Sequence, residues 1–137
     1  MNPASQCPWL GQYPEGVPAS IDVAAFPTLA ALLEASFSQF ASRAALSYMG
    51  REYSYAELER QSRALAAFLQ SRGLKKGDRV AVMMPNVPQY AETVAAVLRA
   101  GMVVVNVNPL YTPRELEHQL NDSGARALVV GAARHTA

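Results

Sequence analysis

The segment of residues 73–112 limits the fold more than any other part of this sequence. It contains a short apolar run, residues 80–84, with turn residues on both sides. Such a run is typical of a strand buried on both faces of a parallel sheet. A second apolar run, residues 102–105, follows a stretch of helical length. The segment therefore predicts two parallel strands joined by a right-handed helical crossover.

The helix of this crossover is predicted to begin at Pro88 and to end before Gly101. Proline fits the first turn of a helix because its missing N–H has no intrahelical acceptor there. Glycine fits a left-handed residue that ends a helix. One helical face is predicted to be buried, and its residues are Tyr90, Val94, Val97 and Leu98.

The residues before the crossover predict a helix and a hairpin. Thr28 is a good N-cap for a helix that ends near Ser42. Its predicted core stripe consists of Leu29, Leu32, Leu33, Phe37 and Phe40. Residues 44–48 and 51–53 predict two short antiparallel strands, because the intervening turn contains Gly50, which tolerates positive φ.

Two capping boxes predict the starts of two further helices. Ser54 with Glu57 opens a helix that runs to about Arg72, and Thr112 with Glu115 opens one that ends before Gly124. The inner stripe of the first is predicted to contain Tyr55, Leu58, Ser62, Leu65 and Leu69. Residues 127–130 predict a third parallel strand. The fold class is therefore α/β, a parallel-type sheet with helices on both faces plus a short antiparallel hairpin.

The chain divides into two predicted parts. Residues 1–27 contain five prolines and predict an extended lead-in, which Trp9, Leu10 and Tyr13 are expected to anchor. Residues 28–137 form the α/β part. Residues 131–137 are too few for a helix that would cover the last strand. We therefore expect a C-terminally truncated fragment of a larger doubly wound domain.

Composition excludes several classes of function. The 137 residues have a formal net charge of +1, too small for a broad field that attracts nucleic acid. Cys7 is the only cysteine, so no intrachain disulfide or thiolate cluster is available. The first residues do not read as a secretory signal. Apolar runs are far shorter than a membrane span. We expect a cytoplasmic protein, with peripheral attachment to the inner membrane as the alternative.

The candidate ligand-proximal loop follows residues 102–105 and contains Asn106, Asn108 and Tyr111. It leaves the carboxyl end of a parallel strand, where open α/β sheets bind ligands. The alternative is a turn whose asparagine side chains bond their own backbone. No catalytic or metal-binding residue is assigned, since His118 has no second ligand at metal-binding spacing.

A basic cluster of Lys75, Lys76 and Arg79 lies near Gly73 and Gly77. The spacing of these glycines does not match that of a phosphate-binding loop. We therefore interpret the cluster as a solvated turn before a buried strand.

Two stretches resemble motifs of the adenylate-forming, or AMP-binding, enzymes. Residues 98–112, LRAGMVVVNVNPLYT, resemble the second core motif in the form found in bacterial long-chain fatty-acid–CoA ligases. Residues 53–58, YSYAEL, resemble the first core motif. The resemblance extends from about residue 9 to about residue 130, and it identifies the chain as the N-terminal portion of such a ligase.

This resemblance implies an activity for the parent enzyme. With ATP and Mg²⁺ such an enzyme converts a long-chain fatty acid to an acyl-adenylate, and the coenzyme A thiol then displaces AMP. The phosphate-binding loop, the metal-binding carboxylates and the catalytic lysine of the family follow the second core motif at some distance. None of them matches a position in this chain. No cofactor is therefore assigned to the fragment, which is expected to be inactive alone.

Two other functions stay open. A medium-chain or aryl acid–CoA ligase of the same superfamily would share these motifs, and a noncatalytic α/β binding module would share the sheet. The expected partners are the rest of the polypeptide and, for the parent enzyme, fatty acid, ATP and coenzyme A. An uncovered sheet edge or apolar face also predicts self-association.

Overall fold

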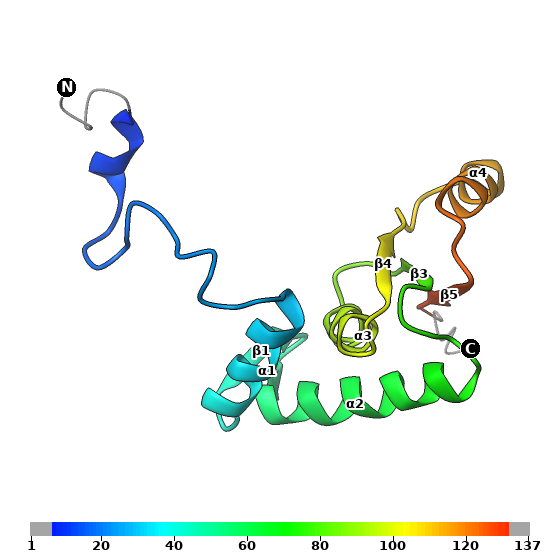
Figure 1. The fold of residues 1–137 in the computed structure, drawn as a ribbon, viewed down its shortest axis with the longest axis horizontal. Coiled ribbons are helices and arrows are strands. Elements are labelled where there is room, and N and C mark those ends of the chain that lie inside the picture. The colour runs from blue at the N-terminus through cyan, green and yellow to red at the C-terminus, as the bar shows by residue number, and fades with distance from the viewer. Residues whose placement is uncertain (1–6, 132–137) are drawn as a thin grey trace.

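The structure, a computed structural model, describes residues 7–131 and contains a parallel sheet of three strands in the order β4-β3-β5 (Figure 1). The central strand is β3 (Arg79–Met83), and its neighbours are β4 (Val103–Asn106) and β5 (Ala127–Val130). Both pairings are parallel. The three predicted strands are confirmed, each within one residue of its expected bounds.

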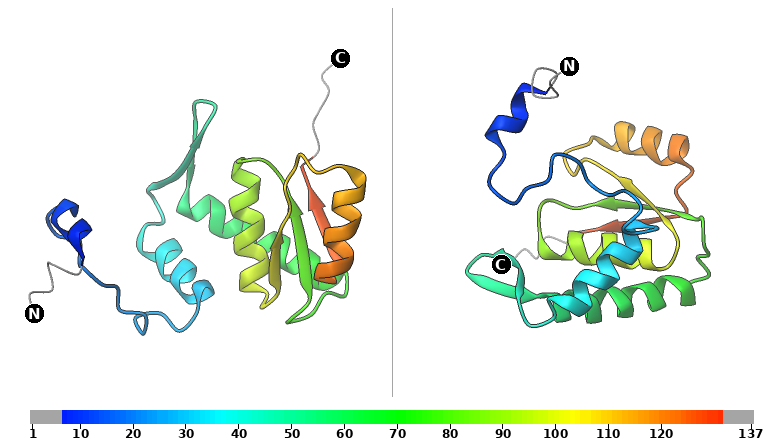
Figure 2. Two further views of the ribbon diagram at one scale, coloured as in Figure 1. Left: turned by 90° about the horizontal axis from the view of Figure 1, so that it is seen from above. Right: turned by 60° about the vertical axis from the view of Figure 1, so that its left-hand side comes forward.

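Helices cover both faces of this sheet (Figure 2). On one face lie α2 (Tyr55–Ser71) and α3 (Pro88–Arg99). On the other face lies α4 (Pro113–Ser123), which carries the chain from β4 across β3 to β5. The α/β fold class is therefore confirmed, with the crossover from β3 through α3 to β4 at its centre.

The hairpin and the first helix lie beside this sheet. The helix α1 (Leu29–Gln39) contacts α2 and α3. The strands β1 (Ala44–Tyr48) and β2 (Arg51–Ser54) form the predicted antiparallel pair. Their turn has positive φ at both central residues, 49° at Met49 and 79° at Gly50. Two consecutive left-handed residues match the twist of the flanking strands and close the hairpin tightly.

In the described residues, buried apolar side chains form two clusters. The larger lies between the sheet and its helices, with Val80, Val97 and Leu69 as buried members. The smaller joins α1, α2 and α3 through Phe37 and Leu58, with further contacts from the hairpin. The hairpin and α1 are thus fixed to the same helices that cover the sheet.

The predicted helix ends are confirmed except on α1, which ends at Gln39 and not near Ser42. Ser54 Oγ accepts the backbone N–H of Glu57 at 3.1 Å, and Glu57 Oε2 accepts the backbone N–H of Ser54 at 3.0 Å. The same reciprocal pair joins Thr112 and Glu115. Gly101, which follows α3, has a φ of 72°. Local sequence chemistry therefore sets these boundaries.

Two predicted core faces are wrong in part. On α1 only Phe37 of the expected stripe is buried, and Leu29 and Leu32 are exposed because α1 makes its core contacts near its C-terminal end. Val103, at the start of β4, is 45% exposed. The prediction of a fully buried second strand fails there because β4 is an edge strand in this sheet.

The lead-in contains a short 3-10 helix, η2 (Pro8–Gln12), and extends away from the sheet (Figure 1). The expected anchoring by Trp9 and Tyr13 is not seen, since these side chains are 56% and 43% exposed. The backbone hydrogen bonds found in this segment are local. For example, the Leu10 N–H donates to the Cys7 carbonyl. Residues 1–6 of the lead-in and residues 132–137 lie outside the described part, and the division at residue 27 stays a prediction.

Candidate functional site

Asn106, the first candidate residue, is the last residue of β4 and connects two helices. Its Oδ1 accepts the hydroxyl proton of Tyr90 from α3 at 2.9 Å. Its backbone carbonyl accepts a hydrogen bond from Nε2 of Gln119 on α4, at 2.9 Å. Because α3 and α4 lie on opposite faces of the sheet, Asn106 joins the two helical layers at the carboxyl end of β4.

Asn108 and Tyr111 lie in the turn that follows. Asn108 Oδ1 accepts the backbone N–H of Leu110 at 3.0 Å, and its carbonyl accepts the backbone N–H of Tyr111 at 3.1 Å. These bonds define an Asx-type turn. The side chain of Asn108 thus bonds its own local backbone, whereas that of Asn106 bonds a neighbouring helix. The three candidates therefore occur in one loop but have different structural partners.

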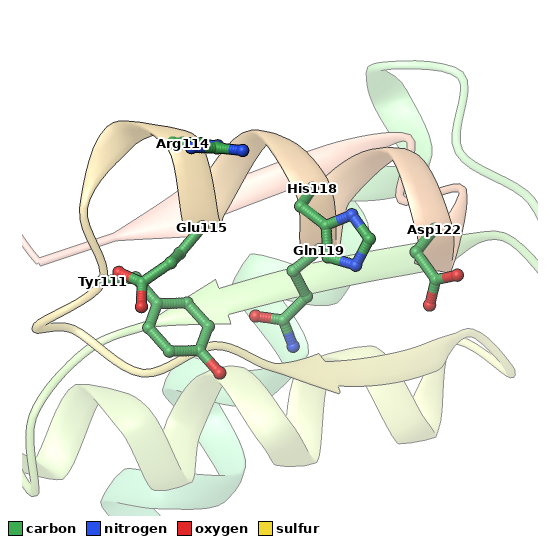
Figure 3. Close-up of a pocket in the computed structure, with 6 residues that line it drawn as sticks. All are labelled: Tyr111, Arg114, Glu115, His118, Gln119 and Asp122. Atoms are coloured by element: carbon green, nitrogen blue, oxygen red, sulfur yellow. The ribbon is translucent and has the colours of Figure 1, made fainter.

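Tyr111 also lines a polar groove along α4, with a volume of about 620 Å³ (Figure 3). The side chains that line it are Tyr111, Arg114, Glu115, His118, Gln119 and Asp122. The Thr112 hydroxyl and backbone N–H lower the pKa of Glu115, which is held in its capping box. The groove therefore presents charges of both signs on an exposed helix face and does not select one sign of ligand.

His118 lies on the same groove. Within residues 7–131, no cluster of three or more histidine, cysteine, aspartate or glutamate side chains is placed to hold a metal ion. Cys7, near the other end of the described chain, is a free thiol. The geometry gives no reason to assign a metal site to this groove.

The basic cluster at residues 75–79 lies at the opposite, amino end of the strands. Lys75 donates its backbone N–H to Asp78 Oδ2 at 2.7 Å, and Gly77 donates its backbone N–H to the Gly101 carbonyl at 2.9 Å. These bonds describe a closed turn that connects α2 to β3. Its geometry agrees with a solvated turn before a buried strand.

A second cavity, of about 600 Å³, lies at the carboxyl ends of β3 and β5. Residues from α2, α3 and the two strand ends line it: Leu65, Met84, Pro85, Val87, Gln89, Glu92, Thr93, Val129, Val130 and Gly131. Its wall is mainly apolar, and Glu92 is the one acidic residue among the described residues that line it. Both the volume and the position at strand carboxyl ends are typical of small-molecule sites in α/β proteins.

Glu92 is the residue that sequence reasoning missed. It is only 8% exposed although it is charged in water. Burial, and then the negative charge of Glu57, raise the pKa of its carboxyl, while Arg51 opposes the shift. The only signal in the sequence is an acidic residue inside a helix that is otherwise mostly apolar, and such a residue is usually solvated. Burial of Glu92 arises because α2 and the sheet enclose α3 together.

The sheet, its two helical layers and its carboxyl-end cavity define an open α/β protein of the doubly wound type. The family model of the AMP-binding enzymes matches residues 33–137, and the chain belongs to this family.

Known proteins show how this similarity is distributed. The chain is 54% identical over 123 residues to the long-chain-fatty-acid–CoA ligase of Salmonella typhimurium. The aligned region covers 89% of this chain and 22% of that protein. The chain is 40% identical over 83 residues to 4-coumarate–CoA ligase 3 of rice, Oryza sativa subsp. japonica, covering 61% of this chain and 15% of that one. The match thus spans about a fifth of the length of the Salmonella protein and about a seventh of the rice protein.

A solved structure agrees with the fold. The N-terminal subdomain of Klebsiella oxytoca NpsA, in complex with 3-hydroxyanthranilyl-AMSN, superposes with a TM-score of 0.72 at 32% identity. The superposition covers 77% of this chain and 27% of that one. The described fold is therefore similar to part of an N-terminal subdomain of this protein.

Proposed function

We propose that this chain is the N-terminal structural part of an ATP-dependent ligase that activates long-chain fatty acids as acyl-adenylates and transfers them to coenzyme A. The observation that supports this most is the 54% identity over 123 residues to a long-chain-fatty-acid–CoA ligase. The match to a 4-coumarate–CoA ligase is shorter and weaker, 40% over 83 residues. Similarity thus favours a long-chain acyl substrate over an aryl acid.

The role of the chain itself is to supply a scaffold. Its central crossover sets two parallel strands beside each other, and Asn106 joins the helices on both faces at their carboxyl ends. ATP, Mg²⁺ and coenzyme A are cofactors and substrates of the proposed parent enzyme, and none is assigned to residues of this chain. We therefore expect the isolated chain to be inactive.

The experiment that tests this proposal measures acyl-CoA formation by the full-length protein. It would be supplied with ATP, Mg²⁺, coenzyme A and, in separate reactions, palmitate, octanoate or 4-coumarate. The proposal expects the largest kcat/KM for palmitate. The isolated chain of 137 residues should show ATP–pyrophosphate exchange only at background. Preference for another acid, or exchange by the isolated chain, would contradict the corresponding part of the proposal.

An aryl acid–CoA ligase is the second candidate. The rice relative is named for 4-coumarate, and the Klebsiella structure holds a 3-hydroxyanthranilyl compound. The same substrate panel separates the two candidates, because an aryl ligase would use 4-coumarate more efficiently than palmitate. A medium-chain ligase would instead prefer octanoate. A noncatalytic binding module would be indicated if the full-length protein used none of these acids.

The location of the parent enzyme is a separate proposal. Among residues 7–131, the helices are all too short or too polar to cross a membrane. We propose a cytoplasmic enzyme that attaches peripherally to the inner membrane to collect its apolar substrate. Cell fractionation tests this directly, since a salt or carbonate wash should release a peripheral protein from the membrane fraction. Resistance to both washes would contradict it.

A further inference from the structure

The carboxyl-end cavity combines an apolar wall with one buried acid. Leu65, Met84 and Val129 supply apolar surface from α2, the end of β3 and β5. Glu92 belongs to the same wall and is 8% exposed, and neighbouring Thr93 is 2% exposed. Thr93 Oγ1 donates to the Gln89 carbonyl at 2.7 Å, so its hydroxyl is already satisfied. Among the described residues that line the cavity, Glu92 is thus the only one with a charged side chain.

In the part of the chain that the structure describes, one neighbour hydrogen-bonds to the Glu92 carboxylate. With the Gln61 amide oriented so that its nitrogen faces Glu92, Nε2 lies 2.8 Å from both carboxylate oxygens. An ionised carboxylate has about four acceptor positions, so a single amide does not fill them. Within residues 7–131 no other side chain donates to Glu92. The charge of Arg51 lowers the pKa of Glu92, but the Arg51 guanidinium pairs with Glu57 at 3.2 Å. The carboxylate therefore retains free acceptor capacity.

We infer that this cavity is a binding site for a small alkylamine, whose ammonium group donates to Glu92 and whose carbon chain lies on Met84, Leu65 and Val129. This site goes beyond the proposed function, in which no residue lining this cavity is given a role. A carboxylate ligand would be repelled by Glu92, and a neutral alcohol would offer a weaker, uncharged donor. An ammonium group supplies both the charge and the several donors that a buried carboxylate accepts best.

Binding of hexylammonium to the isolated chain tests this inference. Backbone amide chemical shifts would be followed by NMR near neutral pH, at a concentration at which the chain sediments as a monomer, with hexanol and hexanoate as comparison ligands. Hexylammonium should shift the amides of Met84, Val130 and Gly131, which line the cavity. Hexanol should bind at least tenfold more weakly because its hydroxyl carries no positive charge to pair with Glu92. Hexanoate should leave these amides unshifted because Glu92 repels its carboxylate.

Variants separate recognition by Glu92 from apolar binding. Glu92→Gln keeps the side-chain volume and should weaken hexylammonium at least tenfold, because the neutral amide cannot pair with the ammonium charge. Glu117→Gln, on an exposed position of α4, is the matched control and should bind like the parent. Gln89→Glu places a second carboxylate at the exposed rim of the cavity and should tighten binding several-fold. This third variant keeps the test decisive if Glu92→Gln does not fold.

Several results would overturn the inference: no shift at the cavity amides, equal affinity for hexanol, or unchanged affinity in Glu92→Gln. Shifts centred on His118 instead would place the amine in the groove along α4 and would also overturn it. Because this test measures binding by the isolated chain, its failure leaves the acyl-CoA assay of the full-length protein unaffected. The two proposals can therefore fail separately.

Discussion

Arg126 Nη1 lies 3.0 Å from both carboxylate oxygens of Asp78, although 48 positions separate the two residues in sequence. Asp78 immediately precedes β3, and Arg126 immediately precedes β5. The carbonyl of Asp78 also accepts the backbone N–H of Val103, the first residue of β4, at 2.9 Å. One residue therefore connects the amino ends of all three parallel strands.

Asp78→Asn should lower the free energy of unfolding near neutral pH. The backbone N–H of Lys75 and then the Arg126 guanidinium lower the pKa of Asp78. A depressed folded pKa adds stability above the unfolded pKa, and this stability is lost as the pH falls through the folded pKa. The difference in stability between parent and variant should therefore shrink with acidification. Urea unfolding at a series of pH values measures it.

The control for this prediction is Glu117→Gln, which removes an exposed carboxylate of α4. Its stability should follow that of the parent at each pH. The difference in free energy of unfolding between Asp78→Asn and the parent could instead stay constant into strong acid. That result would show that the pair with Arg126 does not depend on charge.

Gly101→Ala should destabilise the chain by about 1–2 kcal/mol, the cost of a left-handed residue with a Cβ. Gly101 has a φ of 72°, and an added Cβ would meet Lys76 Cγ at 3.1 Å. The lysine side chain can move, so most of the cost comes from the backbone. Gly11→Ala is the matched control, because an added Cβ there meets no heavy atom within 4 Å. Equal stabilities of the two variants would contradict the argument.

Arg99→Ala should cost more than Arg63→Ala. The Arg99 side chain is 11% exposed, and its guanidinium lies 2.7 Å from Glu34 and over the ring of Phe37. Its removal breaks the ion pair between α3 and α1 and leaves a space beside the ring of Phe37, a loss of roughly 2–3 kcal/mol. Arg63 pairs with Glu59 on the surface, where such a pair contributes about 0.2–0.5 kcal/mol. Thermal unfolding of the two variants tests the order, and a reversed order would refute it.

The isolated chain should self-associate as its concentration rises. Within residues 7–131, the outer strands β4 and β5 each pair on one side only, and Val130 on β5 is 56% exposed. Open strand edges with apolar side chains favour pairing between copies. Val130→Lys should therefore weaken the association seen by sedimentation, whereas Val23→Lys in the lead-in should leave it unchanged. A parent chain that sediments as a monomer at every concentration would disprove the prediction.

Local signals in the sequence predicted most of the fold. The capping boxes at Ser54 and Thr112, and the left-handed glycine at Gly101, depend on short-range chemistry and therefore fix helix ends correctly. The helical periodicity of apolar residues predicted that Val97 of α3 is buried, but it did not predict the burial of Glu92. A helix enclosed by the sheet and α2 buries more than one face, which a single apolar stripe cannot reveal.

The site was less predictable than the fold. The sequence indicated the loop after β4, and Asn106, Asn108 and Tyr111 do occur there with different partners. The carboxyl-end cavity depends on residues from α2, α3 and two strands that are far apart in sequence. Only the packed arrangement of these elements brings Glu92 and Val129 to one wall, so no local pattern marked it.

The order β4-β3-β5 also has a consequence for how the chain folds as it leaves the ribosome. The central strand β3 is made first, and both of its neighbours are made later. After β4 emerges, Val80 and Ala81 still lack the partners Ala127 and Leu128 on their other side. One edge of β3 therefore stays unpaired until α4 and β5 have been synthesised. Chaperone contact is most useful during that interval.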